Sequence, residues 1–252
     1  MTSPTTSTFL TEQQIGQYWD TGYLVVKSLI PGNVVKGVRD RLLGIVEGTY
    51  GDWNPGLMQV VDPTVRLNPK NRPIPASVQH PAKHDQVFER LACHRRLQSA
   101  MSDLLQGPVK LFTDQSINKV NWITTEQGGR TYYHQDSWYW RVEPKLGANA
   151  WIACDEVGPN AIALAVMPGS HQQWKLIEHE SYYDDPRICH GETLKPFMRH
   201  RIPLDRVDHT KEILVPMSPG DALFFTNYTW HRSEPNRTCQ HKFAYAIAYK
   251  RI

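Results

Sequence analysis

The residues of this chain best suited to chemistry are a histidine and an aspartate two positions apart, His134 and Asp136. On an extended strand or at its end, two such side chains point the same way, so the pair can hold one metal ion. An open-sided site needs one more ligand, and His231, far downstream, is the best candidate. Two imidazoles and one carboxylate form the open site of non-haem iron(II) oxygenases. The spacing therefore predicts a metal site at His134, Asp136 and His231.

The surroundings of His231 matter because a His-x-Asp pair arises easily by chance in a chain with eleven histidines. His231 follows the segment Pro219–Phe225 and precedes Arg232-Ser233 and Pro235-Asn236. This order is typical of a turn, a strand and a histidine at the start of another strand. The context favours His231 over the other histidines as the third ligand.

The first 108 residues are expected to be a mainly helical lead-in to the site. Thr11–Gln14 has the pattern of a capping box, and the helix that it opens should end at Gly22, before a short strand at Tyr23–Val26. A second helix should follow Pro31-Gly32-Asn33. A third is expected from Val87 to Leu104. The segment 52–83, rich in proline and glycine, is expected to be irregular loop.

From residue 109 onward the sequence predicts a mostly β fold. Short segments rich in β-branched and aromatic residues alternate with turn signals, a pattern typical of a sandwich or barrel. A double-stranded β-helix, or jelly roll, is one such closure, and it would bring distant strands together. The long polar segment 172–211 interrupts the series and is expected to form a lid-like insert. The expected strands are 109–123, 130–134, 149–157, 161–167, 212–216, 222–225 and 241–250.

Length and composition favour a single domain over residues 1–252. Hydrophobic residues make up 40% of the chain and charged residues 21%, as in ordinary globular proteins. The net charge of +3 does not indicate a basic surface that would bind nucleic acid. No stretch approaches the roughly 20 apolar residues of a membrane span, and no secretion signal is visible. Four widely spaced cysteines fit reduced thiols, so a cytoplasmic location is expected.

Taken together, these motifs resemble the phytanoyl-CoA dioxygenase family, the group that also contains ectoine hydroxylase. The resemblance implies a jelly-roll core, iron(II), 2-oxoglutarate as co-substrate, and oxidation of an unactivated C–H bond by O₂ with release of succinate and CO₂. It also implies that His171 is structural. The presence of Asp136 argues against halogenation, because related halogenases replace this carboxylate by a small residue. The motifs that carry the resemblance are Gly22–Val26, His134-Gln135-Asp136, Met167–His171, Gly220-Asp221 with Phe224-Phe225, and His231-Arg232-Ser233 with Pro235-Asn236.

The resemblance further implies a cationic partner for the distal carboxylate of 2-oxoglutarate. Lys242 occupies the position where the family usually has an arginine, and it shares one face of its strand with small alanines. A lysine can hold a carboxylate but lacks the bidentate fork of arginine. Arg237, in the turn after Pro235-Asn236, is the competing candidate. Gln115 matches a family glutamine near 2-oxoglutarate, although an exposed strand glutamine is an alternative.

The substrate is expected to be a small molecule, amino acid-like or an intermediate of natural-product biosynthesis. Trp138 and Trp140 follow the His-x-Asp motif, where ectoine hydroxylase-like members keep an aromatic residue near the substrate; core packing is the alternative. Arg199 and Arg201 in the insert suggest an anionic or zwitterionic substrate, although such charges usually face water.

Hydroxylation is the expected reaction. Desaturation and ring formation would use the same ligands, so they stay open as alternatives. Two further alternatives are a jelly-roll protein without catalytic activity and an iron dioxygenase that does not use 2-oxoglutarate.

Overall fold

The computed structural model describes residues 8–51, 53–120, 131–183 and 187–252. Its centre is a large antiparallel sheet, whose strand order leaves β1 (Tyr23–Val26) and β4 (Val109–Lys119) at the edges. Two central strands, β5 and β11, are buried along their whole length, as expected for strands covered on both faces. In order across the sheet, the strands are β1 (Tyr23–Val26), β11 (Ala222–Thr226), β5 (Gly147–Ala153), β13 (Lys242–Arg251) and β4 (Val109–Lys119).

A smaller sheet faces the large one and closes the jelly roll. It contains β10 (Ile213–Val215), β6 (Leu164–Val166) and β12 (His231–Ser233). Alternating residues of β5 divide between two cores, since Trp151 packs between the sheets while Ile152 packs toward the helices. The fold class is therefore the predicted one, mostly β with flanking helices around a jelly-roll core.

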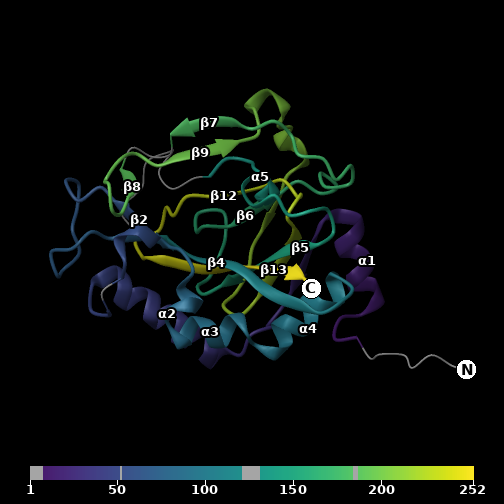
Figure 1. The fold of residues 1–252 in the computed structure, drawn as a ribbon, viewed down its shortest axis with the longest axis horizontal. Helices are drawn as coiled ribbons and strands as arrows, with labels where there is room; N and C mark the ends of the chain where they lie inside the picture. The colour runs from purple at the N-terminus through teal and green to yellow at the C-terminus, as the bar shows by residue number, and fades with distance from the viewer. Residues whose placement is uncertain (1–7, 52, 121–130, 184–186) are drawn as a thin grey trace, which may run out of the picture.

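Helices cover the outer face of the large sheet (Figure 1). They are α2 (Gly32–Glu47), α3 (Gln86–Ala92) and α4 (Arg95–Leu104). The single helix predicted over 87–104 is wrong, because the chain breaks at Cys93 and His94. Leu91 and Leu97 are spaced so that a continuous helix would put them on different faces, and the break lets both be fully buried.

The segment expected to be irregular loop contains two strands, β2 (Met58–Val61) and β3 (Pro75–Val78). β2 pairs with β8 (Ile188–His190) of the insert, so distant parts of the chain create this sheet. Pairing between distant segments can form a strand even where the local proline and glycine content favours irregular loop. The insert also contains a two-stranded antiparallel sheet of β7 (Glu180–Tyr183) and β9 (Met198–Arg201). Short 3₁₀ helices complete the chain: η1 (Pro55–Leu57), η2 (Pro81–Lys83), η3 (Leu204–Arg206) and η4 (His209–Lys211).

The predicted strands of the core correspond to observed ones within a few residues, with two exceptions. The end of the strand expected over 109–123 lies outside the described residues from position 121 onward, as does the start of that over 130–134. The described part of the latter forms a single bridge at His134 instead of a strand. No helix in the described part of the chain is long and apolar enough to cross a membrane.

The first helix, α1 (Glu12–Thr21), begins and ends as predicted. The Thr11 hydroxyl accepts a hydrogen bond from the Gln14 backbone, and the Gln14 side chain accepts one from the Thr11 backbone. Gly22 ends the helix at a φ of 87°, and a Cβ there would lie 2.5 Å from Nδ1 of His171. The helix end is thus packed directly on the loop that contains His171.

Replacing Gly22 with alanine should lower the free energy of unfolding by more than about 1 kcal/mol, because the left-handed backbone strains any L side chain and the new methyl group would meet His171. Gly16→Ala is the matched control, since Gly16 lies inside the same helix with open space at its Cβ position. It should stabilise the protein by about 0.5–1 kcal/mol. Chemical denaturation of both variants is the measurement, and equal effects would contradict the prediction.

Candidate metal centre and active site

The centre of the site is a bridge between two backbone segments. The His134 amide donates to the His231 carbonyl at 3.1 Å, and the His231 amide donates to the His134 carbonyl at 3.2 Å. Residues that face each other in an antiparallel bridge project their side chains to the same side. The two imidazole centroids accordingly lie 4.3 Å apart.

Both imidazole rings are oriented by the backbone. Nδ1 of His134 lies 2.8 Å from the Tyr132 carbonyl, and Nδ1 of His231 lies 3.0 Å from the Thr229 carbonyl. A carbonyl only accepts, so each Nδ1 carries the proton and each Nε2 offers a lone pair. Burial lowers the pKa of His134 to about 3 and that of His231 to about 4. Both rings are therefore neutral near pH 7, as metal binding requires.

Asp136 is the first residue of α5 (Asp136–Trp140), a short helix that the sequence did not predict. Its Oδ1 lies 3.7 Å from Nε2 of His134 and 3.7 Å from Nε2 of His231. Its other oxygen accepts a hydrogen bond from the Asn149 side chain. Burial raises the pKa of Asp136 to about 6.

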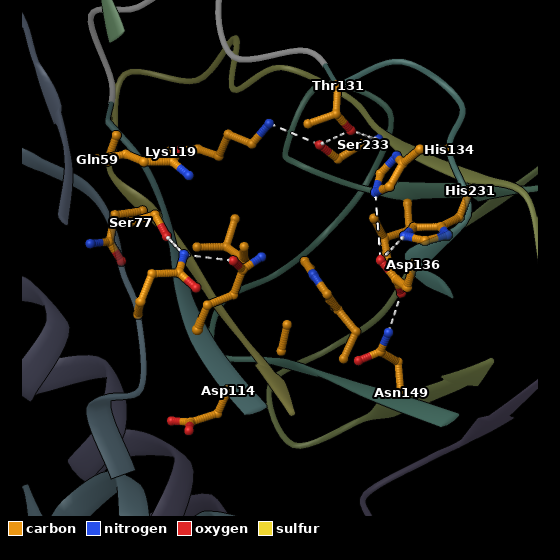
Figure 2. Close-up of a pocket in the computed structure, with 18 of the residues that line it drawn as sticks. Gln59, Ser77, Asp114, Lys119, Thr131, His134, Asp136, Asn149, His231 and Ser233 are labelled. Atoms are coloured by element: carbon orange, nitrogen blue, oxygen red, sulfur yellow. Dashed lines mark hydrogen bonds and ion pairs between the residues drawn. The ribbon is translucent and has the colours of Figure 1, made fainter. Parts of the chain in front are cut away.

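The three side chains fit a metal ion. Their ligand atoms lie within 4.8 Å of one another, and Figure 2 shows them pointing toward one another. Metal bonds of about 2.0–2.2 Å would span such separations. Two neutral nitrogens and one carboxylate oxygen make the donor set that suits iron(II) with open positions.

Gln135, between two of these residues, fastens the start of the insert to the site. Its fully buried side chain donates to the carbonyls of Lys175 and Tyr228 and accepts from the amide of Ile177. Its backbone amide donates to Nε2 of His179 at 3.1 Å. No role was predicted for Gln135, and the only signal in the sequence is its place between two candidate ligands.

The two tryptophans predicted near the substrate have different surroundings. Trp138 stacks on His179 of the insert, with centroids 4.6 Å apart and planes 13° apart. Trp140 lines the cavity and contacts Phe112 edge to face. The structure therefore places Trp140 at the site, while Trp138 packs beneath the insert.

The two arginines of the insert also differ. Arg199 lines the cavity. Arg201 pairs with Glu180 at 2.8 Å and lies over the Tyr132 ring at 4.7 Å, so it joins the insert to the segment before His134. Of this pair, the structure brings only Arg199 to the site.

A cavity of about 180 Å³ extends from the three candidate ligands along β4 and β13. Its wall includes the apolar side chains of Trp151, Leu164 and Phe225 and the small side chains of Ala246 and Ala248. Elsewhere it is polar, with Gln115 held by a 2.8 Å hydrogen bond from the Gln79 side chain. Its polar lining also includes Gln59, Lys119, Thr131, Arg199 and Ser233.

Lys119, a cation for which no role was predicted, also lines the cavity. Its ammonium donates to the Ser233 hydroxyl at 2.9 Å, and Figure 2 shows the Lys119 side chain pointing toward Ser233 and Thr131. Lys119 and Gln115 lie on the same, cavity-facing side of β4. The alternation of side chains along a strand predicts this, because the two residues are an even number of positions apart. Lys242 lies directly across from Lys119 in the ladder but is not among the described lining residues. Arg237 pairs with Glu234 at 3.6 Å in the turn.

His171 lies apart from the metal cluster. Its Nε2 is 2.9 Å from the Trp19 carbonyl at the end of α1. The His171 ring also packs beside Gly22. The position fits the structural role that the resemblance implies.

A jelly roll with two histidines and one carboxylate at a cavity has the donor set of the non-haem iron oxygenase class. Residues 18–244 match the family described as phytanoyl-CoA dioxygenase (PhyH), and the chain belongs to this family. It is similar to "Dioxygenase andF" of Emericella variicolor, at 22% identity over 240 residues, which cover 91% of this chain and 70% of that protein.

Solved structures share the fold at low sequence identity. EctD from S. alaskensis, with 2-oxoglutarate and 5-hydroxyectoine, has a TM-score of 0.70 and 18% identity, covering 100% of this chain and 79% of that one. The 2-oxoglutarate-dependent epimerase SnoN has a TM-score of 0.64 and 18% identity, covering 95% and 82%. The carbocyclase SnoK has a TM-score of 0.62 and 16% identity, covering 97% and 86%. These likenesses confirm the jelly-roll fold.

Metal affinity should weaken by roughly tenfold between pH 7.5 and pH 5. Burial raises the pKa of Asp136 to about 6, so below that pH the metal must displace one proton. The two histidines stay neutral over this range because their pKa values are lowered to about 3 and 4. Anaerobic calorimetry with iron(II) in buffers of different ionisation enthalpy counts the protons released. Release of two protons at pH 5, or no change in affinity, would contradict this assignment.

Proposed function

We propose that this enzyme is an iron(II)- and 2-oxoglutarate-dependent dioxygenase that hydroxylates a C–H bond of a small molecule. The observation that carries the proposal is the convergence of His134, Asp136 and His231 at one end of a cavity with Lys119 in its wall. In the balanced reaction, substrate, O₂ and 2-oxoglutarate give hydroxylated substrate, succinate and CO₂. When bound, the iron would let O₂ act as the oxidant, and O₂ would take two electrons from 2-oxoglutarate, which loses CO₂, and two from the substrate C–H bond.

The protein holds the three ligands ready before any metal arrives. Backbone carbonyls fix the protonated Nδ1 of each histidine, and Asn149 holds the outer oxygen of Asp136. The remaining donors, two Nε2 atoms and one Oδ1, face a common point. Such outer hydrogen bonds orient ligands and raise metal affinity, and losing one typically costs 10–100-fold.

Lys119 and Ser233 are the proposed site for the distal carboxylate of 2-oxoglutarate. Ser233 follows His231 by two positions on β12, so both side chains face the cavity. The Ser233 hydroxyl lies 2.9 Å from the Lys119 ammonium and 3.1 Å from the Thr131 hydroxyl. A dicarboxylate bound to the metal at one end would meet this cation and these hydroxyls at the other. Gln115 lines the same cavity.

Other outcomes remain compatible with the same ligands. The solved structures with this fold include an epimerase and a carbocyclase, so ring formation is the second candidate reaction, with desaturation beside it. The apolar wall at Trp151, Leu164 and Phe225 would serve each outcome, because it keeps water from the reacting centre. A non-catalytic role fits less well, since all three ligands are present and oriented.

Replacing His134, Asp136 or His231 with alanine should abolish stoichiometric iron binding and lower 2-oxoglutarate turnover by more than about a hundredfold, because even outer-shell changes cost 10–100-fold. His84→Ala is the control, since His84 is an exposed histidine outside the cavity. Iron content and succinate formation are the measurements. Wild-type turnover in any of the three variants would exclude that residue as a ligand.

Lys119→Met and Lys242→Met should separate the two candidates for the 2-oxoglutarate anchor. Loss of a charge-assisted hydrogen bond of about 1.5–3 kcal/mol should raise the half-saturating 2-oxoglutarate concentration roughly 10–100-fold in Lys119→Met. Lys242→Met should change it less than about threefold, because Lys242 does not line the cavity in the described structure. Both half-saturating concentrations are measured from initial rates of succinate formation. A larger increase in Lys242→Met than in Lys119→Met would assign the anchor to Lys242, the position where the family usually has an arginine.

A further inference from the structure

One wall of the cavity comes from outside the jelly roll. β2 and β3 belong to the lead-in and contribute Gln59 and Ser77 to the lining, and Ile188 of the neighbouring β8 lines it too. Figure 2 shows Gln59 and Ser77 on the side of the cavity across from the three candidate metal ligands. The jelly roll already supplies those ligands, so this added wall requires a separate explanation.

Gln59 and Ser77 are cross-strand partners. They face each other in the antiparallel ladder of β2 and β3, so both side chains project from the same face of that sheet. The neighbouring pair, Met58 and Val78, projects to the other face, where Val78 belongs to the hydrophobic core. Gln59 and Ser77 are themselves buried, with 8% and 6% of their surfaces exposed. Alternation along the two strands therefore directs one pair into the core and the polar pair into the cavity.

The orientation of the Gln59 amide follows from its partner. A terminal nitrogen of Arg199 donates to Oε1 of Gln59 at 2.9 Å. A guanidinium has no acceptor, so the amide oxygen must be the atom that faces Arg199, and the amide nitrogen must point away from it. That nitrogen has no hydrogen-bond partner among the described residues, and it is not enclosed by protein. Gln59 thus offers two N–H donors to the cavity.

The Ser77 hydroxyl is a second donor in the same place. It accepts a hydrogen bond from the side-chain nitrogen of Gln79 at 3.3 Å, and this nitrogen also donates to Gln115 at 2.8 Å. A hydroxyl that accepts from an amide still has its proton to donate, and none of the described residues accepts it. Directly opposite residues of an antiparallel pair have Cβ atoms about 4.5–5.5 Å apart, so one acceptor atom can meet both side chains.

We propose that Gln59 and Ser77 form a subsite for a carbonyl oxygen of the substrate, so that the enzyme acts on uncharged carbonyl compounds. A carbonyl oxygen has two lone pairs and can accept from both donors at once. The bond from Arg199 to the Gln59 oxygen polarises the amide and strengthens its N–H groups as donors. The charge of Arg199 thus acts through Gln59, and the pair itself presents neutral groups. This inference rests on the proposed function for the role of the metal and of 2-oxoglutarate.

The test observes the Gln59 amide itself, so it does not depend on turnover. The enzyme, labelled with ¹⁵N and loaded with zinc(II) and saturating 2-oxoglutarate, is titrated with cyclohexanone and with acetophenone. Each ketone is compared with the hydrocarbon that has C=CH₂ in place of C=O, methylenecyclohexane or α-methylstyrene. The side-chain NH₂ signals of Gln59 should move downfield and saturate with at least one ketone but not with its hydrocarbon. Those of Gln135, which already donates to two carbonyls, should stay in place.

Three variants separate recognition from a structural role. Gln59→Glu keeps an oxygen for Arg199 but has no N–H donor, so it should raise the dissociation constant of the ketone at least about tenfold, because the carbonyl loses a buried partner. Ser77→Ala should raise it roughly 2- to 12-fold, the effect of one neutral hydrogen bond. Gln13→Glu, exposed on α1 outside the cavity, is the matched control and should bind like wild type. Saturation-transfer NMR of the ketone protons gives the constants, and thermal unfolding identifies any loss of folding.

The proposal is overturned if neither ketone moves the Gln59 signals more than its hydrocarbon does. It is also overturned if folded Gln59→Glu binds the ketone like wild type, because Gln59 would then only hold Arg199 in place. Benzoate that moves the same signals at a lower concentration than acetophenone would show an anion subsite and overturn it too. Substrate-free 2-oxoglutarate decarboxylation by the wild-type iron enzyme tests the proposed function separately. Its absence would remove that function whatever the amide signals show.

Discussion

The structure of the site depends on one backbone interaction, the pair of hydrogen bonds that join His134 and His231. On its other side, His231 pairs with Val166 of β6, so its register is fixed from both edges. A slip of one residue in this ladder would turn His231 away from the cavity and Arg232 into it. The register is specified by burial, because Leu164 and Val166 of β6 pack into the core between the two sheets.

The two faces of β12 carry side chains with different roles. His231 and Ser233 face the cavity, while Arg232, between them, faces the other way and forms ion pairs with Glu212 and Glu234, each at 2.6 Å. These bonds raise the pKa of Arg232 against the effect of burial, and burial with partners on both sides makes removal of one partner costly, at about 3–5 kcal/mol. The ion pairs therefore fix the face of β12 that points away from the cavity, while the face with His231 and Ser233 remains available for ligands.

The sequence predicted the parts of this protein that local rules govern. The spacing of His134 and Asp136, the capping box at Thr11 and the glycine at position 22 each act over a few residues, and the structure has the helix boundaries and the clustered side chains expected from them. It did not predict β2 and β8, which exist because they pair with each other across the chain. Lys119 was missed for a similar reason, since its proximity to Ser233 follows from how two sheets meet.

The insert was expected to be a mobile lid, and its contacts limit what movement it can make. Its start is fastened to Gln135 by two side-chain hydrogen bonds, with Lys175 and Ile177, and soon after β9 the Ile202 amide donates to the Tyr133 carbonyl at 2.7 Å. Movement of the whole segment would break bonds on both neighbours of the metal ligand His134. The middle of the insert is held as well, because β8 pairs with β2 and the Tyr139 hydroxyl bonds to the His200 backbone of β9. Any closing motion that preserves these contacts would therefore be small.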